Sequence, residues 1–285
     1  MPGKILITPA ELSAMMEAGS TVLIDTRSPE NYAAGHIAGA VNMFEIFTFL
    51  AMSTKEGMAE LKTKFTDAFG AAGVGGDETV VFYEGSMNSG FGMSCRGYYL
   101  MSFLGYDKVH VLHGGLAAWQ AASMPVTTEV PTPVAKHFPV SSVGEHMMLD
   151  KHDMLAALGD DGIVTLDVRD VDEWVGTSSS PYGPDFAPRK GRIPGAKWLE
   201  WYRLMKPTSD GPMFKAREEL LAELHTVGVT PDTPVYLYCF KGARASNSLI
   251  ALREAGVKDV RMYFGSWNEW SRDPALPIET GMPYA

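Results

Sequence analysis

The sequence has only two cysteines, Cys95 and Cys239, among its 285 residues. A disulfide framework or a cysteine-based zinc site needs more cysteines at closer spacing, so neither is expected. No run of about 18 apolar residues occurs, which argues against a membrane span. The first residues, MPGKILITPAELSAMM, lack a basic stretch followed by an apolar one, so no secretory signal is expected. Two thiols without a signal predict a cytoplasmic protein.

Positive charge is also scarce, since 24 Lys and Arg residues face 34 Asp and Glu residues and the formal net charge is −10. This balance argues against general attraction to nucleic acid or to anionic lipid. An anionic substrate would therefore need a local cationic site. Metal ligands are sparse as well: His36 is interpreted as a residue that stabilises its loop, because no second ligand stands at suitable spacing. We expect no metal and no cofactor.

The clearest feature of the sequence is a pattern of motifs that occurs twice. The segments TVLIDTR (21–27) and GIVTLDVR (162–169) both end an apolar stretch in Asp-x-Arg, with Asp25 and Asp167 142 positions apart. Three further pairs follow in the same order: GHIAGA at 35–40 with GRIPGA at 191–196, TVVFYE at 79–84 with PVYLYC at 234–239, and GGLAAW at 114–119 with GSWNEW at 265–270. The chain therefore contains two copies of one unit.

The spacing of these pairs locates two insertions. The second copy gains 14 residues between Val175 and Gly191, in a stretch rich in Ser, Pro and Gly that predicts a loop. The first copy gains four residues after its third strand, within GSMNSGFGM.

Helical patterns lie between the short apolar strands, and several of them end at glycine. They are ELSAMMEAG, GMAELKTKFTDAFGAAG and CRGYYLMSFLG in the first half, and HDMLAALGD, KAREELLAELHTVG and RASNSLIALREAG in the second. This alternation predicts an α/β fold in which each copy is a mostly parallel sheet with helices on both faces. The proline-rich segment MPVTTEVPTPVAKHFPV predicts an extended linker. We expect domains at 1–124 and 141–285, joined by a linker at 125–140.

The third strand of the second copy ends at Cys239, and a helix is expected to begin close behind, near Arg244. Between them lies the loop Cys-Phe-Lys-Gly-Ala-Arg, in which Gly242 permits unusual dihedral angles. A tight strand-to-helix turn places Cys239 at the carboxyl edge of the sheet, where ligands of open α/β folds bind. Its backbone N–H groups can form an anion-binding nest, and the positive end of the helix points the same way.

We call this arrangement, a loop with inward-facing N–H groups followed by the start of a helix, the cradle. It favours a thiolate, which is the nucleophilic form of cysteine. The same donors would stabilise a persulfide anion. No Cys–His pairing is apparent in this segment, which fits a thiolate activated by the cradle itself. Lys241 and Arg244 add positive charge where an anionic sulfur donor would approach.

These residues resemble the rhodanese family, specifically its tandem-domain members, over nearly the whole chain. The resemblance rests on IDTRSPENYAAGHIAGAVNM, LDVRDVDEW with GRIPGA, the Cys239 loop and YFGSWNEW. It implies a sulfurtransferase whose catalytic cysteine, Cys239, stands on a six-residue loop of the carboxyl-terminal domain. Glu84 occupies the equivalent position in the first copy and cannot hold a transferable sulfur, so that copy is expected to be catalytically silent.

The resemblance also implies the reaction. Cys239 would take the outer sulfur of thiosulfate, or of a similar donor such as 3-mercaptopyruvate, and pass it to cyanide or to a thiol. Members that use thiosulfate carry two basic residues directly after the cysteine, and mercaptopyruvate-using members carry small neutral ones. This chain has Phe240 and then Lys241, so it keeps one cation, and thiosulfate is favoured.

Other residues are candidates for the active-site loop and pocket, each with a structural alternative. Arg189 and Arg192, in APRKGRIPG, are expected to bind the anionic end of a substrate, unless they are solvated loop cations. Asp167 stands at the same sheet edge as Cys239, although an Asp-x-Arg pair can also fix a loop. Arg244 and Lys241 could instead be solvated cations on an exposed turn, and Arg244 could also pair with a carboxylate of the other domain. The remaining loop residues assigned to the site are Phe240, Lys241, Gly242 and Ala243.

Two other functions compete with sulfur transfer. A cysteine-dependent phosphatase of the related dual-specificity type, or an arsenate reductase, would need a loop of the form Cys-x5-Arg, whereas this chain has Cys-x4-Arg. A non-catalytic rhodanese-like interaction protein is the third reading, and the presence of Cys239 weakens it. Cys95 is expected to be a packing residue, with a regulatory thiol as the alternative.

Overall fold

The computed structural model describes residues 4–283 and contains two compact units. Residues 1–3 and 284–285, at the outer ends of the two predicted domains, lie outside the described residues. The first unit comprises residues 1–49, 59–145 and 205–214, and the second comprises residues 50–58, 146–204 and 215–285. Each unit therefore includes a short segment from the opposite half of the sequence, residues 205–214 in the first unit and residues 50–58 in the second.

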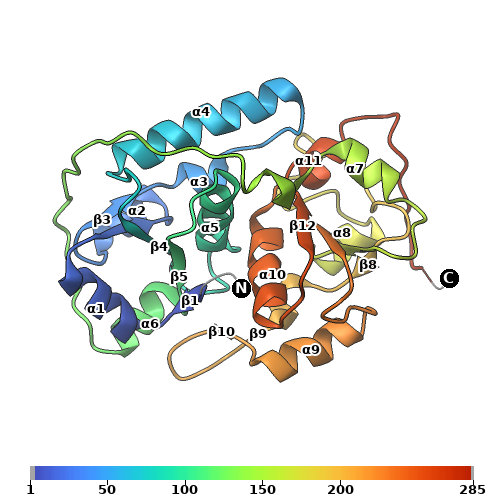
Figure 1. The fold of residues 1–285 in the computed structure, drawn as a ribbon. Helices are drawn as coiled ribbons and strands as arrows, with labels where there is room; N and C mark the ends of the chain where they lie inside the picture. The colour runs from blue at the N-terminus through green and yellow to red at the C-terminus, as the bar shows by residue number, and fades with distance from the viewer. Residues whose placement is uncertain (1–3, 284–285) are drawn as a thin grey trace. The chain divides into compact units, whose positions relative to one another are not determined.

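The first unit is built on a parallel five-stranded sheet of order β1-β5-β4-β2-β3 (Figure 1). Its strands are short and apolar, as parallel strands covered on both faces usually are. The elements of this part of the chain are β1 (Leu6–Ile7), α1 (Pro9–Ala18), β2 (Thr21–Asp25), α2 (Pro29–Ala34), β3 (Ala40–Asn42), α3 (Glu45–Thr48), α4 (Lys55–Ala71), β4 (Thr79–Tyr83), α5 (Met93–Phe103), β5 (Val109–Leu112) and α6 (Gly115–Ala121).

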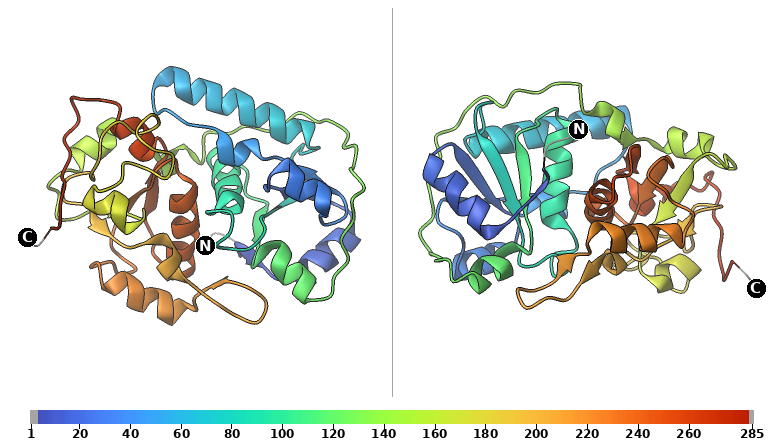
Figure 2. Two further views of the ribbon diagram at one scale, coloured as in Figure 1. Left: turned by 180° about the vertical axis from the view of Figure 1, so that it is seen from behind. Right: turned by 60° about the horizontal axis from the view of Figure 1, so that its bottom comes forward.

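Successive side chains of the central strand β4 point to opposite faces of this sheet. Val81 and Tyr83 join a core cluster with residues of α1, α2 and α6, including Trp119. On the other face, Phe82 packs edge-on against Phe69 of α4, with 6.0 Å between the ring centroids. Figure 2 shows α1 and α5 on opposite sides of the sheet. The sheet therefore buries both faces.

The second unit repeats this design with a parallel sheet of order β6-β12-β11-β7-β8. The elements of the second half are η1 (Glu145–Met147), β6 (Met148–Leu149), α7 (Lys151–Ala156), β7 (Val164–Asp167), α8 (Val171–Val175), β8 (Lys197–Trp198), η2 (Trp201–Leu204), β9 (Met205–Lys206), β10 (Met213–Phe214), α9 (Arg217–His225), β11 (Val235–Tyr238), α10 (Ala243–Glu254), β12 (Val260–Tyr263) and α11 (Ser266–Trp270). Strand by strand, the two sheets have the same order, so the predicted duplication and α/β class are confirmed. No helix among the described residues has both the length and the apolar character needed to cross a bilayer.

The insertion of the second copy, between α8 and β8, is a loop, as its composition predicts. It has a defined shape, because Ser178 Oγ donates to Ser180 O and Ser180 Oγ donates to Gly183 O. Lys190 Nζ donates to Thr177 O across the base of the loop.

The predicted linker is extended and lies against the first unit. Lys136 N donates to Gly70 O, and Phe138 is buried between the rings of Phe69 and Tyr106, each 5.5 Å away. His36 N and Thr127 N each donate to the other residue's carbonyl oxygen. Both ring nitrogens of His36 contact carbonyl oxygens, those of Tyr32 and Glu129. These contacts give His36 the loop-stabilising position expected from the sequence.

The antiparallel pair of β9 and β10 belongs to the first unit, although it comes from the second half of the chain. Phe214 N donates to His113 Nε2 at 2.9 Å, and the two rings stack with 5.8 Å between centroids. Burial lowers the pKa of His113 to about 4, so the neutral ring can accept this hydrogen bond. Residues 205–214 thereby contribute to the stability of the first unit.

We expect Phe214→Ala to destabilise the first unit by about 3 kcal/mol, because it leaves a cavity beside His113. Hydrogen exchange measured by mass spectrometry should show faster exchange in β4 and β5 and little change in β11. Val134→Ala, in a side chain of the same unit that is 79% exposed, is the control. Faster exchange confined to the second sheet would contradict the assignment of this segment.

Candidate active site

Cys239 directly follows β11 and is buried, with 1% of its surface exposed. Gly242 N donates to Cys239 Sγ at 3.1 Å, and α10 begins at the next residue, Ala243. The sulfur therefore lies at the amino-terminal, electropositive end of a 12-residue helix. An anionic sulfur is stabilised by such donors, so this geometry fits a thiolate or a persulfide.

Gly242 is the residue that allows this turn. Its φ of +89° lies in the left-handed region that favours glycine. A Cβ atom at this position would also approach the Phe264 ring to 2.9 Å. Any larger residue would therefore move the N–H group that faces the sulfur.

The start of α11 holds the other side of the loop. Trp267 N donates to Cys239 O at 3.0 Å, and Asn268 N donates to Phe240 O at 2.8 Å. Ser266 Oγ accepts from Cys239 N at 3.2 Å and donates to Tyr263 O at 2.8 Å. The loop is thus held in place by hydrogen bonds with the start of α11.

Ser266 has φ +53°, an unusual value for a residue other than glycine. The first copy has Gly115, with φ +61°, at the matching position. Strained dihedral angles persist where surrounding contacts enforce them, and they gather at functional sites. In the second copy this position is a serine, and its hydroxyl accepts a hydrogen bond from the backbone N–H of Cys239.

The two residues after Cys239 contact the insertion. Phe240 is buried, and its ring lies 5.1 Å from the ring of Tyr182. Lys241 Nζ lies 4.9 Å from the centroid of the same ring, and the lysine is only 7% exposed. Lys241 therefore brings a largely buried positive charge next to the residues of the candidate site.

Arg244 forms a buried ion pair with Glu173, through NH1 to Oε2 at 2.6 Å and NH2 to Oε1 at 3.1 Å. Asp170 Oδ1 lies 3.2 Å from the same guanidinium. Burial by itself lowers the pKa of Arg244, but Glu173, and then Cys239 and Asp170, raise it above its ordinary value. The alternative of a partner in the other domain is wrong, because both carboxylates belong to the unit of Arg244.

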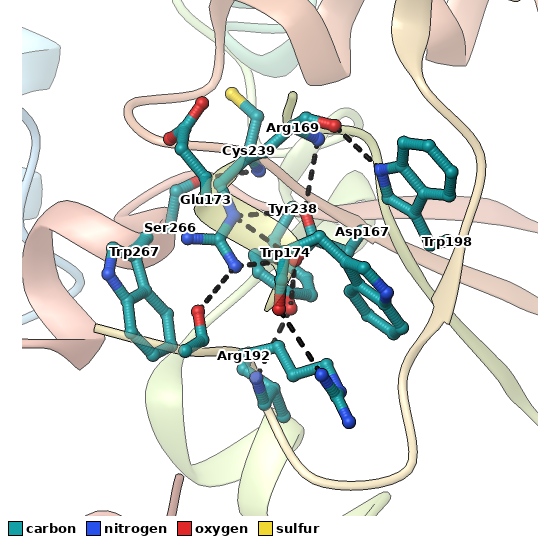
Figure 3. Close-up of polar contacts among 12 residues, drawn as sticks. Asp167, Arg169, Glu173, Trp174, Arg192, Trp198, Tyr238, Cys239, Ser266 and Trp267 are labelled. Carbon is teal, nitrogen blue, oxygen red and sulfur yellow. Dashed lines mark hydrogen bonds and ion pairs between the residues drawn. The ribbon is translucent and has the colours of Figure 1, made fainter. Parts of the chain in front are cut away.

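Asp167 has a structural environment. Its carboxylate accepts hydrogen bonds from the Arg169 side chain and, at 2.6 Å, from Tyr238 OH (Figure 3). Arg169 also donates to Gly191 O, and its guanidinium lies 4.5 Å from the Trp267 ring centroid. The pair thereby fixes the loops around the sheet edge, which was the structural alternative for Asp-x-Arg.

The guanidinium groups of Arg189 and Arg192 have structural partners. Arg189 donates to four backbone carbonyl oxygens at the end of α11 and just beyond it, those of Trp270, Ser271, Asp273 and Leu276. Arg192 donates to Trp174 O and Gly281 O, pairs with Glu279 and lies 4.3 Å from the Trp174 ring centroid. In Figure 3, Arg192 and Cys239 Sγ lie on opposite sides of the Asp167–Arg169 pair. Their predicted substrate contacts stay untested, and the proposal below does not use them.

Among residues 4–283, one group of three potential metal ligands lies close together, formed by Asp170, Asp172 and Glu173. Two of these carboxylates already pair with Arg244. The buried cation offsets part of their negative charge and occupies their oxygens, and the arrangement carries no argument for a metal.

The first copy has the same cradle, with a different occupant. Glu84 takes the place of Cys239, and its carboxylate accepts from Met93 N at 3.2 Å and from Ser94 Oγ at 3.0 Å, at the start of α5. Leu116 N and Ala117 N clamp this loop as α11 clamps the other. Cys95 is buried in α5, as expected for a packing residue.

Sequence reasoning missed three residues that the fold brings to the loop: Glu173, Tyr182 and Ser266. Glu173 stands in the repeated LDVRDVDEW segment, so its charge could have been matched with Arg244. Ser266 could have been noticed because the first copy has glycine at that position. Tyr182 lies in an insertion with no counterpart, and nothing in the sequence marks it.

The repeated sheet and the two matching loops define a tandem protein, and the comparison with known families agrees. The model of the rhodanese-like domain matches residues 8–122 and again residues 150–273. The chain belongs to the rhodanese-like domain family.

Curated relatives match it over nearly their whole length. The thiosulfate sulfurtransferases of Azotobacter vinelandii and Pseudomonas aeruginosa are each 29% identical, with 96% of this chain and 97% of the relative covered. A sulfur carrier protein of Thermus thermophilus is 31% identical, with 88% of this chain and 87% of the relative covered. These relatives support a rhodanese-type transferase.

Solved structures agree in fold. An anaerobic ergothioneine biosynthesis enzyme from Chlorobium limicola, solved with trimethyl histidine, has a TM-score of 0.82 at 23% identity, with 98% of this chain and 70% of that chain covered. At this identity the likeness concerns the fold alone.

Removing one member of the buried Arg244–Glu173 pair should strongly destabilise the second unit. We expect Arg244→Met or Glu173→Leu alone to cost about 3–5 kcal/mol, because the first leaves Glu173 buried without a cation and the second leaves Arg244 with only the partly exposed Asp170. The double variant should recover much of that loss, since it buries no uncompensated charge from the pair. Urea unfolding of the four proteins measures this coupling. Losses that simply add would show that the pair is not coupled.

Glu84 predicts a dependence of stability on pH. Burial raises its pKa to about 8, against the hydrogen bonds from Ser94, Met93 and Gly92 that lower it. The folded protein therefore holds this proton more tightly than the unfolded chain, and the associated stability is lost as pH rises from about 4.5 to about 8.

Glu84→Gln has no carboxyl group to ionise at this position and should escape that loss. The stability of the unmodified protein relative to Glu84→Gln should fall by up to about 1.4 kcal/mol per pH unit in this range and level off above it. Urea unfolding at several pH values measures the difference, with Glu17→Gln at an exposed position as the control. A difference independent of pH would refute the raised pKa.

Proposed function

We propose that this chain transfers a sulfane sulfur from thiosulfate, or a similar donor such as 3-mercaptopyruvate, to a thiophilic acceptor through a persulfide on Cys239. One observation carries the proposal: an N–H group of the loop faces Cys239 Sγ at 3.1 Å, at the amino terminus of α10. The same donor can stabilise the sulfur as a thiolate and as a persulfide anion.

In the first step, the Cys239 thiolate attacks the outer sulfur of thiosulfate. A new S–S bond forms to Cys239, the S–S bond of thiosulfate breaks, and sulfite leaves with that electron pair. No proton transfer is needed, so the cradle requires no neighbouring general base. The hydrogen bonds to Cys239 O and Cys239 N hold the nucleophile in place during the attack.

In the second step, an acceptor such as cyanide or a thiol in its thiolate form attacks the outer sulfur of the persulfide, which leaves as thiocyanate or as the acceptor's persulfide. The persulfide S–S bond breaks, and Cys239 departs as the thiolate, ready for another donor. The two half-reactions make a double displacement with ping-pong kinetics. A protein thiol as acceptor draws support from the relative named as a sulfur carrier protein.

Thiosulfate is the preferred donor in this proposal. Lys241 supplies a cation two residues from the nucleophile, and the protein as a whole carries a net charge of −10 that repels anions. The relatives named thiosulfate sulfurtransferase are consistent with this choice. Phe240, in place of a second cation, leaves 3-mercaptopyruvate as the alternative donor.

Phosphoryl or arsenate chemistry is less well supported. A phosphatase loop needs its arginine free to bind the tetrahedral anion, whereas Arg244 is committed to Glu173 and Asp170. The loop is also one residue shorter than Cys-x5-Arg. A purely binding role would not require a sulfur held against the helix terminus.

The same proposal includes a silent domain at 1–124, a linker at 125–140, a catalytic domain at 141–285 and a cytoplasmic location.

Cys239→Ser should lower thiocyanate formation from thiosulfate and cyanide by about a thousand-fold or more, because it removes the sulfur carrier. Cys95→Ser, in the silent copy, should retain activity. After incubation with thiosulfate, the intact unmodified protein should gain the mass of one sulfur atom, confined to the Cys239 peptide and lost on reduction. Thiocyanate formation that survives Cys239→Ser would exclude the persulfide mechanism.

A further inference from the structure

The insertion of the second copy extends over the residues that follow the candidate nucleophile. Ser179 and Ser180 are buried, and the hydrogen bonds within residues 178–183 give the loop a fixed local shape. Arg272 NH2 donates to Phe186 O and ties the loop to the end of α11. The first copy has no such loop, and its cradle holds a carboxylate.

Tyr182 is the residue of this loop that meets the site. Its ring packs against the rings of Phe240 and Phe186, with 5.1 and 5.8 Å between the ring centroids. The Lys241 ammonium lies 4.9 Å from the centre of the Tyr182 ring. A single aromatic side chain thus contacts both residues that follow Cys239.

The exposures of the two partners differ in an informative way. Tyr182 is 43% exposed, whereas Lys241 is only 7% exposed, although lysine ordinarily extends its ammonium into water. A cation–π contact becomes stronger when the cation is desolvated. The ring therefore compensates part of the hydration that Lys241 loses, and it limits the positions that this flexible side chain can adopt.

A cation held in this way distinguishes donors by charge. A donor with two negative charges interacts about twice as strongly with one ammonium group as a donor with one. The overall negative charge of the protein opposes both donors, so the local cation must supply the attraction. A mobile Lys241 would supply less of it, because ordering the side chain would then cost entropy on binding.

We propose that Tyr182 is a positioning residue that holds the Lys241 ammonium beside the Cys239 loop, and that this pair determines a preference for doubly charged sulfur donors. The inference rests on the proposed function and goes beyond it by naming Tyr182 as the residue that positions the Lys241 cation. The insertion is thereby a specificity element of the catalytic copy.

The test compares Tyr182→Leu, Tyr182→Phe, Lys241→Met and the double variant Tyr182→Leu/Lys241→Met in the full chain. Sulfur transfer to saturating cyanide is measured with thiosulfate, a dianion, and with methanethiosulfonate, a monoanion that also carries a sulfane sulfur. Thermal unfolding of every variant is recorded alongside.

Tyr182→Leu should raise KM for thiosulfate about five-fold, the effect expected from losing one cation–π contact, and change kcat less than about two-fold. The rise should be smaller for methanethiosulfonate. Tyr182→Phe keeps the ring and should behave like the unmodified protein. In the Lys241→Met background, Tyr182→Leu should have no further effect, because the two residues act as one unit.

Four results would overturn the inference. They are an equal rise in KM for both donors, effects of the two substitutions that add, an unchanged KM in Tyr182→Leu, and a loss of kcat that follows a lower melting temperature. Each of these leaves the proposed function standing if the unmodified protein transfers sulfur. An unmodified protein that transfers sulfur from neither donor would instead refute the proposed function, and the inference with it.

Discussion

The interaction on which the site depends is the alignment of backbone N–H groups at the start of a helix with an acceptor side chain at the end of a parallel strand. In the second copy, Gly242 N faces the sulfur of Cys239, and in the first copy Met93 N faces the carboxylate of Glu84. Both helices begin after a glycine with positive φ, Gly242 and Gly92. The cradle is therefore a property of the shared fold, and its occupant decides the chemistry.

In the second copy, the buried arginines near Cys239 form ion pairs with buried carboxylates. Arg244 is held by Glu173, and Arg169 is held by Asp167, so neither cation is left alone in a medium of low dielectric constant. These ion pairs hold together the segments on either side of Cys239. In the proposed sulfur transfer, preorganised dipoles of this kind would act without further rearrangement when charge moves between Cys239 and the donor.

The two copies share the features that pack the fold and differ mainly in the residues of the cradle. Sheet order, strand pairing and the clamp by α6 or α11 are the same in both. The differences are concentrated at the cradle: Glu84 for Cys239, Gly115 for Ser266, and an insertion with Tyr182 only in the second copy. The Glu84 carboxyl group accepts hydrogen bonds in the first cradle, and this cradle holds no thiol.

The duplication, the parallel sheets and the loop that carries Cys239 follow from local features of the amino-acid sequence. Those features depend on short segments, whose apolar pattern and glycine positions specify the local backbone directly. The pairing of charged side chains, in contrast, depends on how the folded chain packs. Arg244 meets Glu173 across 71 positions, Arg189 serves the end of α11, and Tyr182 reaches Lys241 from an insertion. Such pairs arise from the packing of distant segments, and no local pattern encodes which side chains will meet.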